Sequence, residues 1–258
     1  MPYFERLDEG VYRPTEHVSG AWNSREQHIA PAIGLLAHLV ERDHLARRDG
    51  DPLVLGRLSY DILGTLPLEP CEVELRVLRP GRTIELVEAR LSHGGRAGLV
   101  LRAWLVAAGE TTHLAGTTFP ALPAPDALPE WDPSRVWPGG FIAGVRLRRE
   151  QDEPGRARFW ARTDVPLLDE PVSATATALR LVDIANGMTV REDPRAVHFP
   201  NLDLTAHLFR TPEPGGWLGF DTTVSFGPGG LGVTSSRLHD ERGPFGTLAQ
   251  SLTVRPLG

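Results

Sequence analysis

Two polar side chains stand in the middle of predicted β-strands near the C-terminus. Asp203 lies in NLDLTAHLF and Gln250 lies in TLAQSLTV, and both segments are otherwise apolar or built from small residues. Aspartate is rare in strands, and burial raises its pKa, which makes it a better base near neutral pH. A carboxylate that takes a proton from water and an amide that orients the same water are suited to hydrolysis of an activated carbonyl. We therefore predict that Asp203 and Gln250 converge on one water-sized pocket.

The segment DTTVSF adds hydroxyl groups between these two residues in the sequence. Side chains alternate between the two faces of a strand, so Asp221, Thr223 and Ser225 share one face. Ser225 or Thr223 is therefore a candidate to orient the water together with the Gln250 amide. The register does not decide between them.

Residues 201–254 repeat the plan of residues 57–106: a strand-like segment, a Pro-marked bend, two strands about a turn, and a final strand. Matching Gly98 with Gly246 places Arg102 opposite Gln250. Matching Leu58 with Leu202 places Ser59 opposite Asp203. The polar set is therefore absent from the first copy, which predicts one working site and one degenerate half.

Other reactive side chains fit structural roles. Asp183 lies inside a predicted helix and is a fourth candidate for the site, but a structural hydrogen bond to a neighbouring strand is favoured over a catalytic role. The single cysteine, Cys71, begins a strand and is expected to be a small packing residue. His207 follows Asp203 by four residues, roughly 13 Å along a strand, which is too far for an Asp/His pair. No nucleophile elbow, metal-binding cluster or dinucleotide-binding loop is present in the sequence, so no cofactor and no metal are predicted.

Two helices are predicted, one ahead of each repeat. Residues 31–44, PAIGLLAHLVERDH, carry apolar residues at three- and four-residue steps, and Pro31 suits a first helical position. Residues 172–186, VSATATALRLVDIAN, are apolar around most of the circumference and end before Gly187. A helix of this kind must be covered by a sheet.

These elements predict an α+β fold, the double hotdog: two β-α-β-β-β-β units forming a continuous antiparallel sheet around two central helices. The predicted boundaries are residues 1–118 for the N-terminal unit, 119–140 for a Pro-rich linker and 141–258 for the C-terminal unit. Pairing of the two units would remove two open sheet edges.

The composition is that of an ordinary globular protein. The 258 residues are 41 % hydrophobic and 23 % charged, with a net charge of −6. The negative charge and the lack of a long basic run argue against nucleic-acid binding. No run approaches the roughly 20 apolar residues that cross a bilayer, and the first residues do not resemble a secretory signal. We expect a soluble, cytoplasmic protein without membrane partners, and a dimer is a reasonable assembly.

The second half resembles a known family. The sequence LDLTAHLFR and the following GGWLGFDTTVSFGPGGLGVTSSRLHDERGPFGTLAQSLTVR are similar to the C-terminal half of the thioesterase II (TesB-like) acyl-CoA thioesterases. VDIANG and the LDLTxHLxR phrase resemble actinobacterial members. In that family a carboxylate, a hydroxyl residue and a glutamine activate water for thioester hydrolysis. The resemblance implies that Asp203, Gln250, and Ser225 or Thr223 take these roles, with acyl-CoA or another acyl thioester as substrate.

Two departures from the family pattern keep a second hypothesis open. The first helix opens with HIAPAIG instead of a glycine pair, and a one-residue shift would put Val224 at the hydroxyl position. The sequence therefore predicts a thioester hydrolase, with an acyl-chain or acyl-CoA binding protein without turnover as the alternative. A hotdog hydratase using Asp203 and His207 ranks last.

Overall fold

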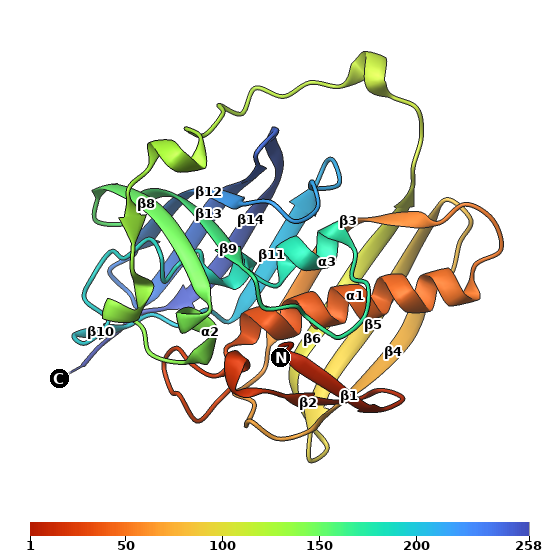
Figure 1. Ribbon diagram of the computed structural model, residues 1–258, viewed down its shortest axis with the longest axis horizontal. Helices are drawn as coiled ribbons and strands as arrows, with labels where there is room; N and C mark the ends of the chain where they lie inside the picture. Colours follow the sequence, from red (N-terminus) through yellow and green to blue (C-terminus); the bar gives the residue numbers. More distant parts are fainter. Residues whose placement is uncertain (258) are drawn as a thin grey trace.

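Two strands from different halves of the chain, β3 (Leu53–Ile62) and β11 (Asp203–Leu208), pair at the centre of the molecule. The computed structural model, which describes residues 1–257, places them in one 13-stranded antiparallel sheet with the order β1-β2-β4-β5-β6-β3-β11-β14-β13-β12-β9-β8-β7 (Figure 1). Ser59 pairs with Thr205 in this central ladder, and their hydroxyl oxygens are 2.9 Å apart. The strand order on each side of this pair is that of the double hotdog, which confirms the predicted fold.

The remaining strands flank the central pair. They are β1 (Phe4–Asp8), β2 (Val11–Pro14), β4 (Cys71–Arg79), β5 (Ile84–His93) and β6 (Arg96–Ala107) in the first half, and β7 (Glu130–Trp131), β8 (Val145–Glu153), β9 (Arg156–Thr163), β12 (Leu218–Phe226), β13 (Leu231–Asp240) and β14 (Gly243–Thr253) in the second. A separate two-stranded ladder joins β10 (Val197–His198) to β15 (Arg255–Pro256).

The first central helix, α1, runs from Ile29 to Arg47, longer than predicted at both ends. His28 is its N-cap, so Pro31 is the third helical residue and not the first. Proline is tolerated there because the N–H groups of the first turn have no partner inside the helix. The helix packs on the sheet, and the Tyr60 hydroxyl of β3 donates to the Ile33 carbonyl.

The second central helix is much shorter than predicted. α3 covers Ala174–Leu179, and a 3-10 helix, η5, follows at Val182–Ile184. The Asn186 side chain accepts a hydrogen bond from the Gly187 N–H and donates to the Phe199 carbonyl. Such side-chain bonds to the backbone compete with helix formation, and they hold the last predicted residues outside a regular helix.

The two central helices lie side by side on one face of the sheet, which we call the inner face (Figure 1). The short helices α2 (Gly140–Ala143), η1 (Glu16–Val18), η2 (Thr112–Leu114), η3 (Pro125–Ala127) and η4 (Pro133–Arg135) lie in connecting segments. The segment between β6 and β7 crosses to the second half and is anchored on the opposite, outer face, where Trp160 donates to the Pro123 carbonyl. The predicted domain boundaries at 118 and 140 stay a prediction. Within residues 1–257, no helix is long and apolar enough to span a bilayer.

Candidate active site

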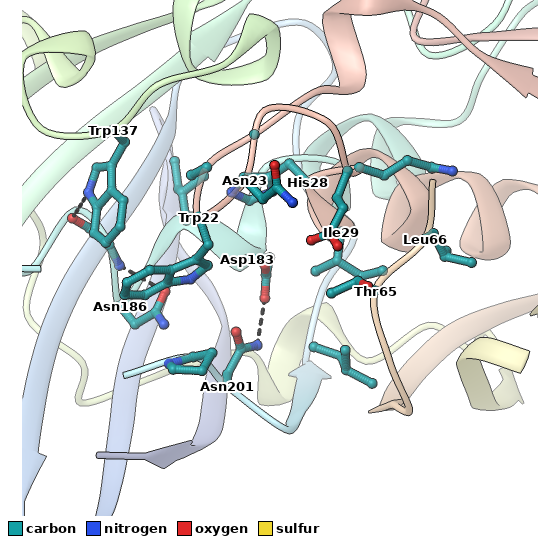
Figure 2. A pocket seen from close by; sticks show the side chains of 18 of the residues that line it. Trp22, Asn23, His28, Ile29, Thr65, Leu66, Trp137, Asp183, Asn186 and Asn201 are labelled. Atoms are coloured by element: carbon teal, nitrogen blue, oxygen red, sulfur yellow. Dashed lines mark hydrogen bonds between the residues drawn. The ribbon is translucent and has the colours of Figure 1, made fainter. Parts of the chain in front are cut away.

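A buried carboxyl group, that of Asp183, lies where the two halves of the molecule meet. Asp183 is 6 % exposed and sits in η5, just beyond α3. Its Oδ1 accepts hydrogen bonds from Asn201 Nδ2 at 2.7 Å and from Gln250 Nε2 at 3.1 Å. Figure 2 shows the bond between Asp183 and Asn201 at the edge of a cavity. Burial raises the pKa of Asp183 from 3.8 to about 7, although the two amide hydrogen bonds act in the opposite direction.

The alternation of β14 explains why Gln250 reaches Asp183. Leu248, Gln250 and Leu252 are buried on the inner face, whereas Ala249 and Ser251 are exposed on the outer face. The second amide arrives on the neighbouring segment, because Asn201 forms a β-bridge with Leu252. Strand pairing therefore brings both amides to the same carboxylate oxygen.

The cavity beside Asp183 has a volume of about 390 Å³, within the range of small-molecule sites. Its walls come from the loop before α1, the loop after β3, η5 and the residues after it, and the end of β14. The lining includes Trp22, Asn23, His28, Ile29, Thr65, Leu66, Trp137, Asp183, Asn186, Met188, Asn201 and Arg255. Most of these side chains surround one space in Figure 2.

The N-terminus of α1 forms part of the same cavity. His28 Nδ1 accepts a hydrogen bond from the Ala30 N–H at 3.2 Å, which requires the proton to be on Nε2. Burial lowers the pKa of His28 to about 3, so the imidazole is neutral. The adjacent Ile29 N–H makes no hydrogen bond to another residue in the described part of the chain. A free N–H at a helix N-terminus can receive a partial negative charge.

Asp203 and Gln250 do not converge, and the predicted pairing of these two residues is wrong. Leu204 and Ala206 are buried on the inner face, so Asp203 and His207 point to the outer face. Asp203 Oδ1 accepts a hydrogen bond from the Ser251 N–H at 2.6 Å. The alternation of apolar residues in β11 already indicated that Leu204 and Ala206 face the core and that Asp203 does not. The outward position of Asp203 and His207 also removes the basis of the hydratase hypothesis.

Thr223 and Ser225 are likewise separated from the cavity. Both are exposed on the outer face of β12, and Val224 between them is buried. Asp221 shares their face, where it pairs with Arg156 and Arg237. No hydroxyl group donates to Asp183 in the part of the chain that the structure describes.

Asp183 was predicted to make a structural hydrogen bond to a neighbouring strand, and it does bond to Gln250 of β14. Sequence reasoning missed its position in the cavity, although a lone acid in an all-round apolar helix was a usable signal. Asn201 was missed altogether. It is the first residue of NLDLTAHLF, where Asp203 was the residue singled out, and only the fold brings Asn201 to Asp183.

The polar residues of the second half are still missing from the first half, as predicted. The residues that correspond between the two halves, however, differ from the predicted alignment. The Ser59–Thr205 pair relates the halves, with Arg102 across from Ser59 and Ala249 across from Thr205. The counterpart of Gln250 is then Ala103, which is fully buried. The first half therefore carries a methyl group where the second carries the amide.

Comparison with known families accounts for both halves of the chain. A family model described as the acyl-CoA thioesterase N-terminal domain matches residues 18–108, and one described as the acyl-CoA thioesterase C-terminal domain matches residues 117–254. No curated protein sequence matches the chain significantly.

Solved structures share the whole fold at low sequence identity. A hot dog fold protein from Alicyclobacillus acidocaldarius has 13 % identity and a TM-score of 0.75, covering 98 % of this chain and 96 % of its own. Acyl-CoA thioesterase II TesB2 from Mycobacterium marinum has 17 % identity and a TM-score of 0.70, covering 99 % and 96 %. A tesB protein from Mycobacterium avium subspecies paratuberculosis has 14 % identity and a TM-score of 0.70, covering 98 % and 96 %.

Proposed function

Because this chain belongs to the acyl-CoA thioesterase family, we propose that it hydrolyses acyl thioesters with Asp183 as the general base. The observation that carries the proposal is the buried Asp183 carboxyl at the cavity, held by two amides. With a pKa of about 7, this group is half ionised near neutral pH and can both take and return a proton. The substrate proposed is acyl-CoA or a related acyl thioester.

Asn201 and Gln250 orient the base. Both amides donate to Oδ1, which fixes the plane of the carboxyl group and leaves Oδ2 without a hydrogen bond to any described residue. Oδ2 then accepts a proton from a water molecule as the water oxygen attacks the thioester carbonyl. Placing the water and carbonyl in the same cavity removes much of the entropic cost of bringing them together.

The carbonyl oxygen becomes negatively charged in the tetrahedral intermediate. The free Ile29 N–H at the start of α1 is the proposed donor to this oxygen, with the helix dipole adding a favourable field. Collapse of the intermediate breaks the carbon–sulfur bond, and Asp183 returns its proton to the departing thiolate. The products are a carboxylic acid and a free thiol.

Thiol release from a panel of acyl-CoA thioesters tests the proposal. Replacing Asp183 with Asn preserves the shape and the acceptor oxygen but removes the base, and kcat should fall by about 10²- to 10⁴-fold. Asp203→Asn is the matched control, because the same chemical change on the outer face should leave kcat unchanged. Equal activity of wild type and Asp183→Asn would refute the role of Asp183.

One observation favours the alternative of binding without turnover. The family resemblance implies a hydroxyl residue at the site, whereas Asp183 is held by two amides. Calorimetry with acyl-CoA, run beside the hydrolysis assay, separates the two functions. Tight binding with no thiol release by the wild-type protein would establish the binding function in place of hydrolysis.

A further inference from the structure

The mouth of the cavity carries a cationic side chain that the proposed reaction does not use. Arg255 is exposed, lines the cavity, and is its only arginine among the described residues. It makes no ion pair with a carboxylate within residues 1–257. Many other arginines of this protein are paired, for example Arg210 with Asp240 at 2.5 Å. An unpaired guanidinium at a cavity mouth is available to an anionic part of a ligand.

A continuous backbone track connects Arg255 to the carboxyl group. Asn201, which donates to Asp183, bridges to Leu252, and the Thr253 N–H donates to the Pro200 carbonyl at 3.0 Å. The pairing continues in the β10–β15 ladder, where His198 lies opposite Arg255. Gln250 and Arg255 therefore mark the inner and outer ends of one segment.

An aromatic wall borders the outer part of this track. The Trp22 ring lies edge-on to His198 with centroids 5.0 Å apart, and it contacts Phe199 at 5.4 Å. Trp22 is 41 % exposed and lines the cavity. Its indole provides an apolar surface in the same cavity as the buried carboxyl and the guanidinium, suited to a slender organic chain.

The length of the track suits a phosphopantetheine arm. Arg255 lies five positions after Gln250, which is roughly 16 Å at the usual strand rise. The arm has about thirteen bonds between sulfur and phosphorus, comparable to four extended peptide residues or about 15 Å. With sulfur beside Asp183, the phosphate of an extended arm would lie near Arg255.

We propose that Arg255, with His198 beside it, is a phosphate-binding subsite that holds the phosphopantetheine arm of the thioester. The proposal rests on the proposed function, because it places the thioester sulfur at Asp183. A guanidinium binds phosphate through parallel hydrogen bonds, and the neighbouring imidazole offers a further N–H donor. The protein has a net charge of −6, so a local cation is needed to retain a polyanionic substrate. Coenzyme A and an acyl carrier protein both supply this phosphate.

Paired substrates with and without phosphate test the subsite. For Arg255→Ala, KM for acyl-CoA and acyl carrier protein should rise about tenfold with kcat retained, because a lost charge-assisted hydrogen bond is worth about that factor. The kcat/KM for the same acyl group on N-acetylcysteamine, which has no phosphate, should not change. The wild-type preference between the two phosphate-bearing substrates identifies the source of the arm.

Arg195→Ala is the control variant. Arg195 is an exposed arginine just before β10, pairs with Asp193 at 2.7 Å and does not line the cavity. Its loss changes the net charge equally and should leave every KM unchanged. The subsite would be overturned if Arg255→Ala lost kcat/KM equally on thioesters with and without phosphate. It would also be overturned if Arg255→Ala lost no kcat/KM with acyl-CoA.

Binding separates failure of the subsite from failure of the proposed function. Calorimetry with coenzyme A should show about tenfold weaker binding to Arg255→Ala than to wild type, and pantetheine should bind both equally. This result would support the subsite even if no thioester were hydrolysed. Equal coenzyme A affinity in both proteins would exclude it, even if hydrolysis were established.

Discussion

Asp183→Asn should make the folded protein more stable at alkaline pH while removing its activity. The pKa of Asp183 rises from 3.8 to about 7 on folding because burial disfavours the charged carboxylate. The folded state therefore binds this proton more tightly than the unfolded chain, by on the order of 4 kcal/mol. This contribution is fully present below about pH 4 and is lost as the pH rises to about 7.

Asparagine remains neutral at every pH and keeps an oxygen to accept the amide hydrogen bonds. The stability gained by Asp183→Asn should therefore be small near pH 4, increase through pH 5 and 6, and level off above pH 7. At pH 8 the gain should approach on the order of 4 kcal/mol, which is a large fraction of a typical folding free energy. Activity of the wild-type enzyme should increase over the same pH range, because the base must be ionised.

Urea unfolding of wild type and Asp183→Asn at pH 4, 5, 6, 7 and 8 measures this difference directly. Asp203→Asn is the control, since that carboxyl lies on the outer face and should not reproduce the increase. A stability difference between wild type and Asp183→Asn that stays constant from pH 5 to pH 8 would refute the reasoning. A decrease with pH would show that the sign is wrong.

Two further perturbations follow from the same contacts. Asn201→Leu removes a hydrogen bond that lowers the pKa of Asp183, so the midpoint of the pH–rate profile should move above 7; an unchanged or lower midpoint would contradict this. Gly34→Ala should destabilise the protein by about 1–3 kcal/mol in urea unfolding, because the new Cβ would lie 2.6 Å from Arg180 Cβ where α1 meets the end of α3. Ala46→Gly, at an exposed position near the end of the same helix, is the comparison, with a loss of at most about 1 kcal/mol from helix propensity alone.

The architecture was largely contained in the sequence. The repeat of strand and turn patterns predicted two similar units, and the double hotdog was confirmed. The family resemblance was also confirmed. Helix lengths were less predictable: α3 ends at Leu179, and Asn186, at the end of the predicted helix, instead bonds to the distant Phe199 carbonyl. Local patterns specify element types, whereas element ends depend on tertiary partners.

The candidate site was predicted only in part. Gln250 was proposed from its polar character in a buried strand, and the amide does contact a buried carboxylate. The carboxylate belongs to Asp183 and not to Asp203, because β11 turns Asp203 to the outer face. Neighbouring residues of a strand point to opposite faces of the sheet. A one-residue error in the assignment therefore moves a predicted site residue from the cavity to the outer surface.

The amino-acid sequence by itself determined the kind of fold, the asymmetry of its halves and the presence of polar residues in apolar segments. These properties follow from the spacing of apolar and polar residues along the chain, which can be read without the structure. Only the tertiary structure decided that Asp183, Asn201 and Gln250 meet and that Arg255 stands at the mouth of their cavity. The physical reason is that strand pairing joins residues far apart in sequence, and neither the pairing nor the dry environment that shifts the pKa of Asp183 exists before the chain folds.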